Sequence, residues 1–212
     1  MRGLILKDFI NMKGQAKVYI LFIVLWGGMA IMRKSGEYFN MLLIMIPAMT
    51  ILTAIAYDDR YKWNRYALTM PVTRKDLIVS KYVFSFIFIA GTIILSMMGQ
   101  TIMGENISYS ITAALIIASV VMIINGVSMP IFFYFGTEHG RIVFFAAFAL
   151  IAVVLMAISN VGFVEEIITA DGSVRYHIPT MGELTLILLT VAFVVTAVSM
   201  LISVKIYENK DF

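Results

Sequence analysis

The chain contains no cysteine, so it forms no disulfide, and its sequence does not indicate a redox compartment. It is also poor in charge, because Asp, Glu, Lys and Arg make up 14% of its 212 residues, whereas soluble domains carry about 25%. Hydrophobic residues account for 61%, and the mean hydropathy is +0.93. This balance excludes a soluble domain with its own core and predicts an integral membrane protein.

Several kinds of chemistry lack the residues that they need. No GxxxxGK[ST] loop occurs, so the chain does not itself bind ATP phosphates. The two histidines, His139 and His177, are predicted on opposite sides of the membrane, and neither has a cluster with metal-ligand spacing. Adjacent Glu165 and Glu166 do not face one another on a strand or helix, which favours a solvated acidic surface over paired catalytic carboxylates. We therefore expect no metal, no cofactor bound by this chain and no nucleic-acid partner.

Six apolar segments approach the length that crosses a membrane, which is about 20 helical residues for about 30 Å of hydrocarbon. They are Val18–Met32, Phe39–Ala56, Tyr82–Met103, Tyr109–Phe135, Ile142–Val161 and Leu184–Ile206. The predicted fold is an all-α membrane protein with six transmembrane helices in a single domain, residues 1–212. No ionisable residue lies near the middle of any span, which lowers but does not exclude a proton-coupled carrier. Gln100, Asn125 and Asn160 are interpreted as interhelical hydrogen-bonding groups rather than as a ligand site.

Basic residues lie mostly on one side of the predicted membrane. Of the 16 lysines and arginines, only Arg33, Lys34 and Arg175 fall on the other side. The positive-inside rule then makes both termini cytoplasmic. The cytoplasmic parts are 1–17, 57–81, 136–141 and 207–212, and the longest external connection is 162–183. Within that connection Ala170–Ser173 is typical of a turn between two short elements, either a hairpin or interfacial segments.

Residues 1–17 predict an amphipathic helix on the inner surface of the membrane. Ile5, Phe9 and Met12 fall on one helical face, and the polar residues mostly lie opposite, namely Lys7, Asp8, Asn11 and Lys13. A signal peptide is the alternative, since basic residues precede an apolar run. The run after Lys17 lacks a small-x-small cleavage site, which favours a retained anchor.

The loop 57–81 holds the densest run of charge in the chain. Trp63, Tyr66 and Met70 recur among these charges, which a plain connector would not need, so the loop is predicted to dock on another protein. The alternative is a solvated basic loop that only enforces topology. Thr73, followed three residues later by Asp76, predicts a capping box where the helix of the third span begins.

Three stretches carry a family resemblance. The loop, with Tyr57-Asp58-Asp59, Lys62-Trp63, Tyr66 through Lys75 and Lys81-Tyr82, resembles the loop between spans two and three of ABC-2 type transporter permeases. More narrowly, it resembles small bacterial permeases grouped with exporters of phenol-soluble modulins and other antimicrobial peptides. The opening Gly3–Phe9 and the tail from Ser203 to Phe212 are similar to the ends of that family.

The resemblance implies a permease in the bacterial cytoplasmic membrane that exports amphipathic peptides. ATP and Mg would be held by a separate ABC ATP-binding subunit, and two permeases, as a homodimer or a related heterodimer, would pair with two such subunits. Residues 1–17 would be an elbow helix, and 57–81 a cytoplasmic coupling loop that supplies a coupling helix. The ATPase-docking residues implied are Asp58, Asp59, Arg60, Trp63, Arg65, Tyr66, Pro71 and Arg74, with Glu138, His139 and Arg141 as a second contact.

Other functions stay open. The chain could be a non-transporting sensor or regulatory binding protein, or it could export lipids, small-molecule antibiotics or ions. A membrane enzyme would need a convergent set of nucleophile, acid or metal ligands within the spans, and the sequence shows none.

Overall fold

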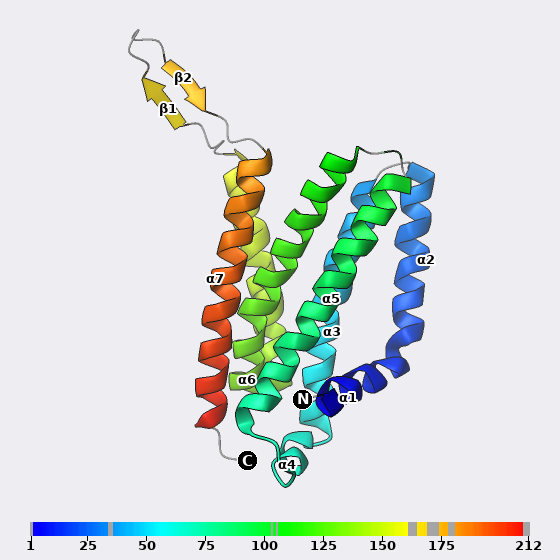
Figure 1. The fold of residues 1–212 in the computed structure, drawn as a ribbon, viewed down its shortest axis with the longest axis vertical. Coiled ribbons are helices and arrows are strands. Elements are labelled where there is room, and N and C mark those ends of the chain that lie inside the picture. Colours follow the sequence, from blue (N-terminus) through cyan, green and yellow to red (C-terminus); the bar gives the residue numbers. More distant parts are fainter. Residues whose placement is uncertain are drawn as a thin grey trace.

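The fold is described from a computed structural model of the chain, which covers residues 2–33, 36–102, 104, 106–160, 165–168, 174–177 and 181–209. Helices dominate these residues: α1 (Arg2–Met12), η1 (Lys13–Gln15), α2 (Ala16–Arg33), α3 (Gly36–Arg60), α4 (Trp63–Ala67), α5 (Arg74–Ile102), α6 (Ile107–Asn160) and α7 (Met181–Glu208). Two short strands, β1 (Glu165–Ile168) and β2 (Val174–His177), pair antiparallel. The long helices stand side by side, α1 lies across one end, and the strands project from the other end (Figure 1).

The six predicted spans are helical wherever the structure describes them, and Met103 and Val161 lie outside the described residues. By length and composition, three described stretches could cross a membrane: α5, the part Ile107–Ile142 of α6, and α7. A fourth is added if the segments Gly3–Gln15 and Lys17–Met32, bent by 66°, form one span. The structure thus describes a helical membrane protein, and the count of six spans stays a prediction. The expected hairpin in the external connection is present as the β1–β2 pair, while its turn at 170–173 lies outside the described residues.

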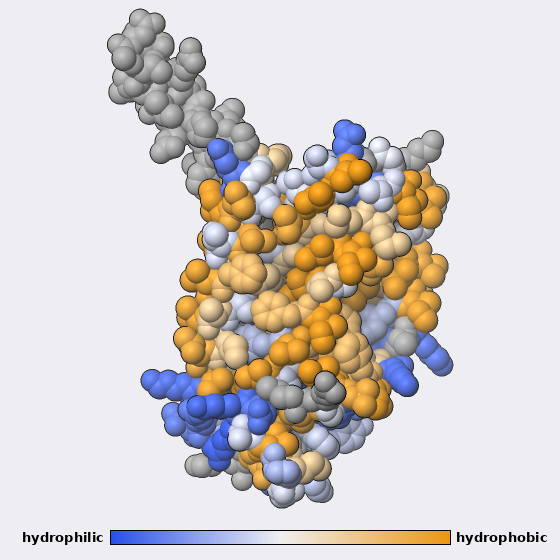
Figure 2. Space-filling model, in the orientation of Figure 1, coloured by the Kyte–Doolittle hydropathy of each residue, from blue (hydrophilic) through white to orange (hydrophobic). Residues whose placement is uncertain are grey.

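Apolar side chains fill the space between the long helices. The larger buried cluster joins α3, α5 and α6 and includes Ile51, Ile78, Phe84 and Phe132. On the face seen in Figure 2, apolar residues cover most of the length of the bundle, and hydrophilic residues gather mostly at the end that carries α4. Because lipid solvates apolar surface, such sides need no polar covering.

The helix α6 is two helices that meet at Gly136. This residue has φ 76° and ψ 177°, a backbone conformation that is open essentially only to glycine. After it the chain returns alongside itself, since a Cβ added at Gly140 would lie 2.2 Å from the Phe132 ring. Both ends of α6 therefore lie at the same end of the bundle (Figure 1). The expected connection 136–141 is wrong in length, because Thr137–Arg141 are helical and the reversal needs only the glycine.

Buried amides link the long helices as predicted. The Asn125 amide donates to Ser85 Oγ at 2.9 Å, and the Gln100 amide donates to Asn40 Oδ1 at 3.1 Å. These contacts join α6 to α5 and α5 to α3, which confirms the interpretation of both amides as interhelical groups. The side chain of Asn160 lies outside the described residues.

Candidate functional site

The loop between α3 and α5 is a built structure rather than an extended connector. Lys62 has a left-handed backbone with φ 50°, and its N–H donates to the Asp59 carbonyl at 3.2 Å, which ends α3 and turns the chain into α4. One turn later Ala67 is fully buried, and Met70 N–H donates to its carbonyl at 3.1 Å. The loop therefore has a fixed shape, with α4 at its tip (Figure 1).

The predicted capping box is present where the loop enters α5. The Thr73 hydroxyl and its backbone N–H both donate to Asp76 Oδ2, at 2.7 and 3.1 Å. In return, Asp76 N–H donates to Thr73 Oγ1 at 3.2 Å. Two N–H groups that have no partner within the helix are satisfied in this way, so α5 begins at a defined residue.

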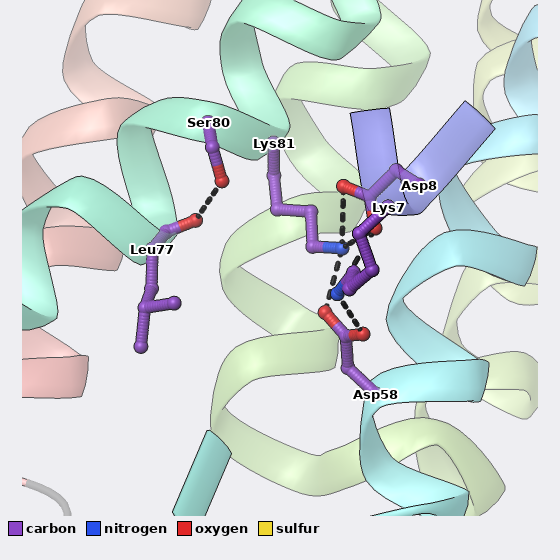
Figure 3. Close-up of polar contacts among 6 residues, drawn as sticks. All are labelled: Lys7, Asp8, Asp58, Leu77, Ser80 and Lys81. Carbon is purple, nitrogen blue, oxygen red and sulfur yellow. Dashed lines mark hydrogen bonds and ion pairs between the residues drawn. The ribbon is translucent and has the colours of Figure 1, made fainter. Parts of the chain in front are cut away.

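Four charged residues meet at the base of the loop, and we call them the ion ring: Lys7 and Asp8 from α1, Asp58 from α3 and Lys81 from α5 (Figure 3). Lys81 Nζ lies 2.7 and 2.9 Å from the two carboxylate oxygens of Asp8 and 2.6 Å from Asp58 Oδ2. Lys7 Nζ lies 3.1 Å from Asp8 Oδ1 and also contacts Asp58 Oδ1. Each cation therefore contacts both anions, and the ring carries no net charge.

Three members of the ion ring are buried, and the fourth, Lys7, is partly exposed. Asp8 is 1% exposed, and Asp58 and Lys81 are each 5% exposed. Buried ions need close partners because they have lost their water, so each member depends on the others. Asp58 stands near the start of the loop and Lys81 at its end, so the ring closes the base of the loop and holds α1 against it.

The position of Asp8 corrects the expected orientation of the N-terminal helix. Leu4, Asp8 and Met12, spaced four residues apart, form the buried face of α1. On the other side Leu6 and Ile10 are exposed by 61% and 53%. The polar residues were predicted to lie mostly opposite the apolar face, but Asp8 shares the buried face with Leu4 and Met12, because its cationic partner Lys81 lies there.

Half of the eight residues predicted to dock on an ATPase face outward. Arg60, Arg65, Tyr66 and Pro71 are exposed, and Tyr66 has 65% of its surface accessible. Tyr61, which was not among the predicted residues, is exposed by 63% beside them. This group combines aromatic and guanidinium groups on one protruding turn.

The other four predicted residues contact their own chain. Asp58 belongs to the ion ring, and Asp59 Oδ2 accepts the Thr137 N–H at 3.1 Å, at the start of the second half of α6. Trp63 is half-buried, with Lys7 Nζ 4.8 Å from its ring centroid. Arg74 Nη1 donates to the carbonyl of Glu208 at 2.5 Å, at the C-terminal end of α7. These four residues hold the loop in place.

A cleft of about 780 Å³ lies between α3 and the reversal in α6. It brings two of the predicted docking residues, Asp59 and Arg60, together with the predicted second contact, Glu138, His139 and Arg141. It is lined by Gln15, Met49, Leu52, Thr53, Ala56, Tyr57, Asp59, Arg60, Phe135, Gly136, Thr137, Glu138, His139 and Arg141. Its lining includes apolar Met49 and Leu52 as well as charges of both signs, so it suits an amphipathic molecule. Among the described residues, no group of three or more His, Asp or Glu could hold a metal ion.

Sequence reasoning missed Lys7, Asp8 and Lys81 as members of one site. A signal was available, since adjacent Lys7 and Asp8 interrupt an apolar helix, and Lys81 precedes the apolar run that begins at Tyr82. Charges on otherwise apolar helices are costly unless they are paired, so they point to partners elsewhere in the chain.

Residues 3–208 match the model of a family described as ABC-2 family transporter protein. No curated protein matches the chain. No solved structure matches it either.

Proposed function

The chain belongs to the ABC-2 transporter family, and from that premise we propose that it is the permease of an ATP-driven exporter that docks its ATPase on the loop 57–81. Family membership makes the chain a membrane component that is not itself catalytic, and it implies partnership with an ABC ATPase subunit. The observation that carries the docking proposal is the exposed aromatic and basic turn around Tyr66, which protrudes from a loop closed at its base by the ion ring.

The docking surface consists of Arg60, Tyr61, Arg65, Tyr66 and Pro71, all of which are exposed. Aromatic and arginine side chains dominate the energetics of protein interfaces, because they bury a large area and make several polar contacts. Trp63, one of the docking residues implied by the resemblance, fits better as a support that holds α4 on α1, since Lys7 lies over its ring.

The membrane arrangement proposed is six spans with both termini in the cytoplasm, in the bacterial cytoplasmic membrane. The distribution of Lys and Arg supports this orientation. The arrangement of the helices also supports it, because α1, α4 and the end of α7 share one end of the bundle (Figure 1). At that end α1 would rest as an elbow helix on the inner leaflet, and Glu138, His139 and Arg141 would offer a second contact to the ATPase. Two permeases, identical or related, would pair with two ATPases.

The mechanism follows from the docking. ATP closes the ATPase pair, the loops move with it, and the two permeases change between inward- and outward-facing states that bind substrate differently. The proposed substrate is an amphipathic or antimicrobial peptide, and the cleft beside Arg60 supports it because apolar and charged side chains both line it. Lipids and small antibiotics share this amphipathic character and are the alternative substrates.

Association with the ATPase tests the docking surface. We expect Arg65→Ala with Tyr66→Ala to weaken co-purification with the partner ABC ATPase by about tenfold or more, because interface anchors each contribute about 2 kcal/mol. Tyr109→Ala is the matched control, since Tyr109 is 55% exposed but belongs to the start of α6. Unchanged association of the double variant would reject this surface.

Reconstitution separates an exporter from a sensor. In liposomes that hold permease and ATPase, an exporter couples ATP turnover to the movement of a fluorescent amphipathic peptide across the bilayer. A sensor would change the ATP turnover when the peptide binds but move none of it. If a fluorescent phospholipid moved instead of the peptide, the protein would still be an exporter, but its substrate would be a lipid.

A further inference from the structure

The ion ring holds the N-terminal helix as well as the loop. Resting on the proposed function, we propose that α1 moves as one body with the docking loop, with Lys7 and Asp8 as the positioning residues that couple them. In this role α1 is a part of the machinery that transmits ATPase movement, in addition to lying on the membrane.

The side-chain contacts of α1 tie it to the loop and to α5 rather than to α2, the helix that follows it in the sequence. Two of the four charges in the ion ring come from α1, and Lys7 also lies over Trp63 of α4. On the side of α5, the Phe9 ring packs edge-on against Phe84 at 5.1 Å and stacks on Phe88 at 5.8 Å. By contrast, α1 continues into α2 through the short η1, with a bend of 66°.

Electrostatics make this connection stiff. If α1 moved away from the loop, Asp8 would leave Lys81, and Lys7 would leave Asp58, which separates unlike charges where little water can replace them. If α1 and the loop move together, all four contacts are kept. The cheaper movement is therefore a joint one, with the change of angle taken up between α1 and α2.

The chain allows α1 to be released without opening the loop. Lys7→Met with Asp8→Asn removes one cation and one anion and leaves the Asp58–Lys81 contact of 2.6 Å to close the base. The matched control is Lys75→Met with Glu208→Gln, which removes an exposed pair 3.4 Å apart.

Distances between spin labels test the joint movement directly, because the chain has no native cysteine to label. Labels are placed at exposed positions: Ile10→Cys on α1, Thr69→Cys on the loop and Leu201→Cys on α7. Pairs of labels are measured in the complete complex with its ATPase, without nucleotide and with ATP. Dilution with unlabelled permease keeps the two labels of a pair within one chain.

We expect the distance from position 10 to position 69 to stay constant within about 1–2 Å between the two states, while the distance from 69 to 201 changes by more. In the Lys7→Met, Asp8→Asn variant the first distance should also change, and in the control it should not. A first distance that changes in the unmodified ring as much as the second would overturn the inference. A distance from 69 to 201 that stays constant while the ATPase is bound would instead overturn the proposed function and the inference with it.

Discussion

The base and the tip of the loop 57–81 use similar residue types in opposite ways. At the base, Asp58 and Lys81 are each 5% exposed, and every ring member contacts two opposite charges. Away from it, Lys75 meets Glu208 at 3.4 Å with side chains 67% and 45% exposed, and Arg65 faces outward. The difference teaches that burial decides what a charge does here: buried charges fix the shape of the loop, and exposed ones remain available to a partner.

The largest effect is expected when one member of the ion ring is removed. Asp58→Asn leaves two lysines facing one carboxylate in a buried site, so the free energy of unfolding should fall by about 3–5 kcal/mol. Thermal unfolding of the purified permease in detergent measures the change. Asp58→Asn with Lys81→Met restores the charge balance and should lose less, and a double variant at least as unstable as the single one would argue against an ion ring.

A smaller loss in the free energy of unfolding is expected from a change in packing at the reversal of α6, where no charge is altered. Gly140→Ala places a methyl group 2.2 Å from the Phe132 ring, so either this ring or the backbone of α6 must shift. We expect a loss of about 1–3 kcal/mol, as for other overpacked sites. Phe132→Leu in the same chain should recover part of it. If Gly140→Ala unfolds like the unmodified protein, the close return of α6 is contradicted.

At the entry to α5, the capping box predicts a still smaller change. Thr73→Ala removes the hydroxyl that bonds Asp76 and should cost about 1 kcal/mol, measured by the same unfolding assay. Thr73→Ser keeps the hydroxyl and serves as the control. Equal losses in both variants would mean that the methyl group, rather than the cap, is responsible.

The smallest effect is expected at the exposed pair. Lys75→Ala should change the free energy of unfolding by at most about 1 kcal/mol, and less at high salt, because water and ions already screen the contact with Glu208. Measuring Lys75→Ala and Asp58→Asn at low and high salt sharpens the comparison. If salt changed the stability effect of Lys75→Ala less than that of Asp58→Asn, the contrast between exposed and buried charges would be contradicted.

Much of the helical framework could be predicted from the sequence, because apolar runs and turn signals are local. The segments that became α2, α3, α5 and α7 were placed by length and hydropathy, and the capping box at Thr73 was predicted from two residues at a fixed spacing. The amides at positions 100 and 125 were assigned for a similar reason, since a polar group in an apolar helix must find a partner.

The ion ring could not be assembled from the same signals. Its members come from positions 7, 8, 58 and 81, and only the packing of α1 against α3 and α5 brings them together. The amphipathic pattern of α1 grouped Asp8 with the polar residues opposite the apolar face, because the spacing of residue types does not show which charges have partners inside the protein. The length of the turn in α6 was missed for a different reason: a glycine at φ 76° reverses the chain in one residue, where a loop of several had been expected.

The last turn of α3 contains two adjacent acidic residues with separate partners. Asp58 contacts Lys81 of α5, and Asp59 accepts the Thr137 N–H at the start of the second half of α6. Neighbouring residues on a helix point about 100° apart, so a single twist of this turn must act on both contacts at once. A rotation of the end of α3 would therefore be transmitted to α5 and to the second half of α6 at the same time.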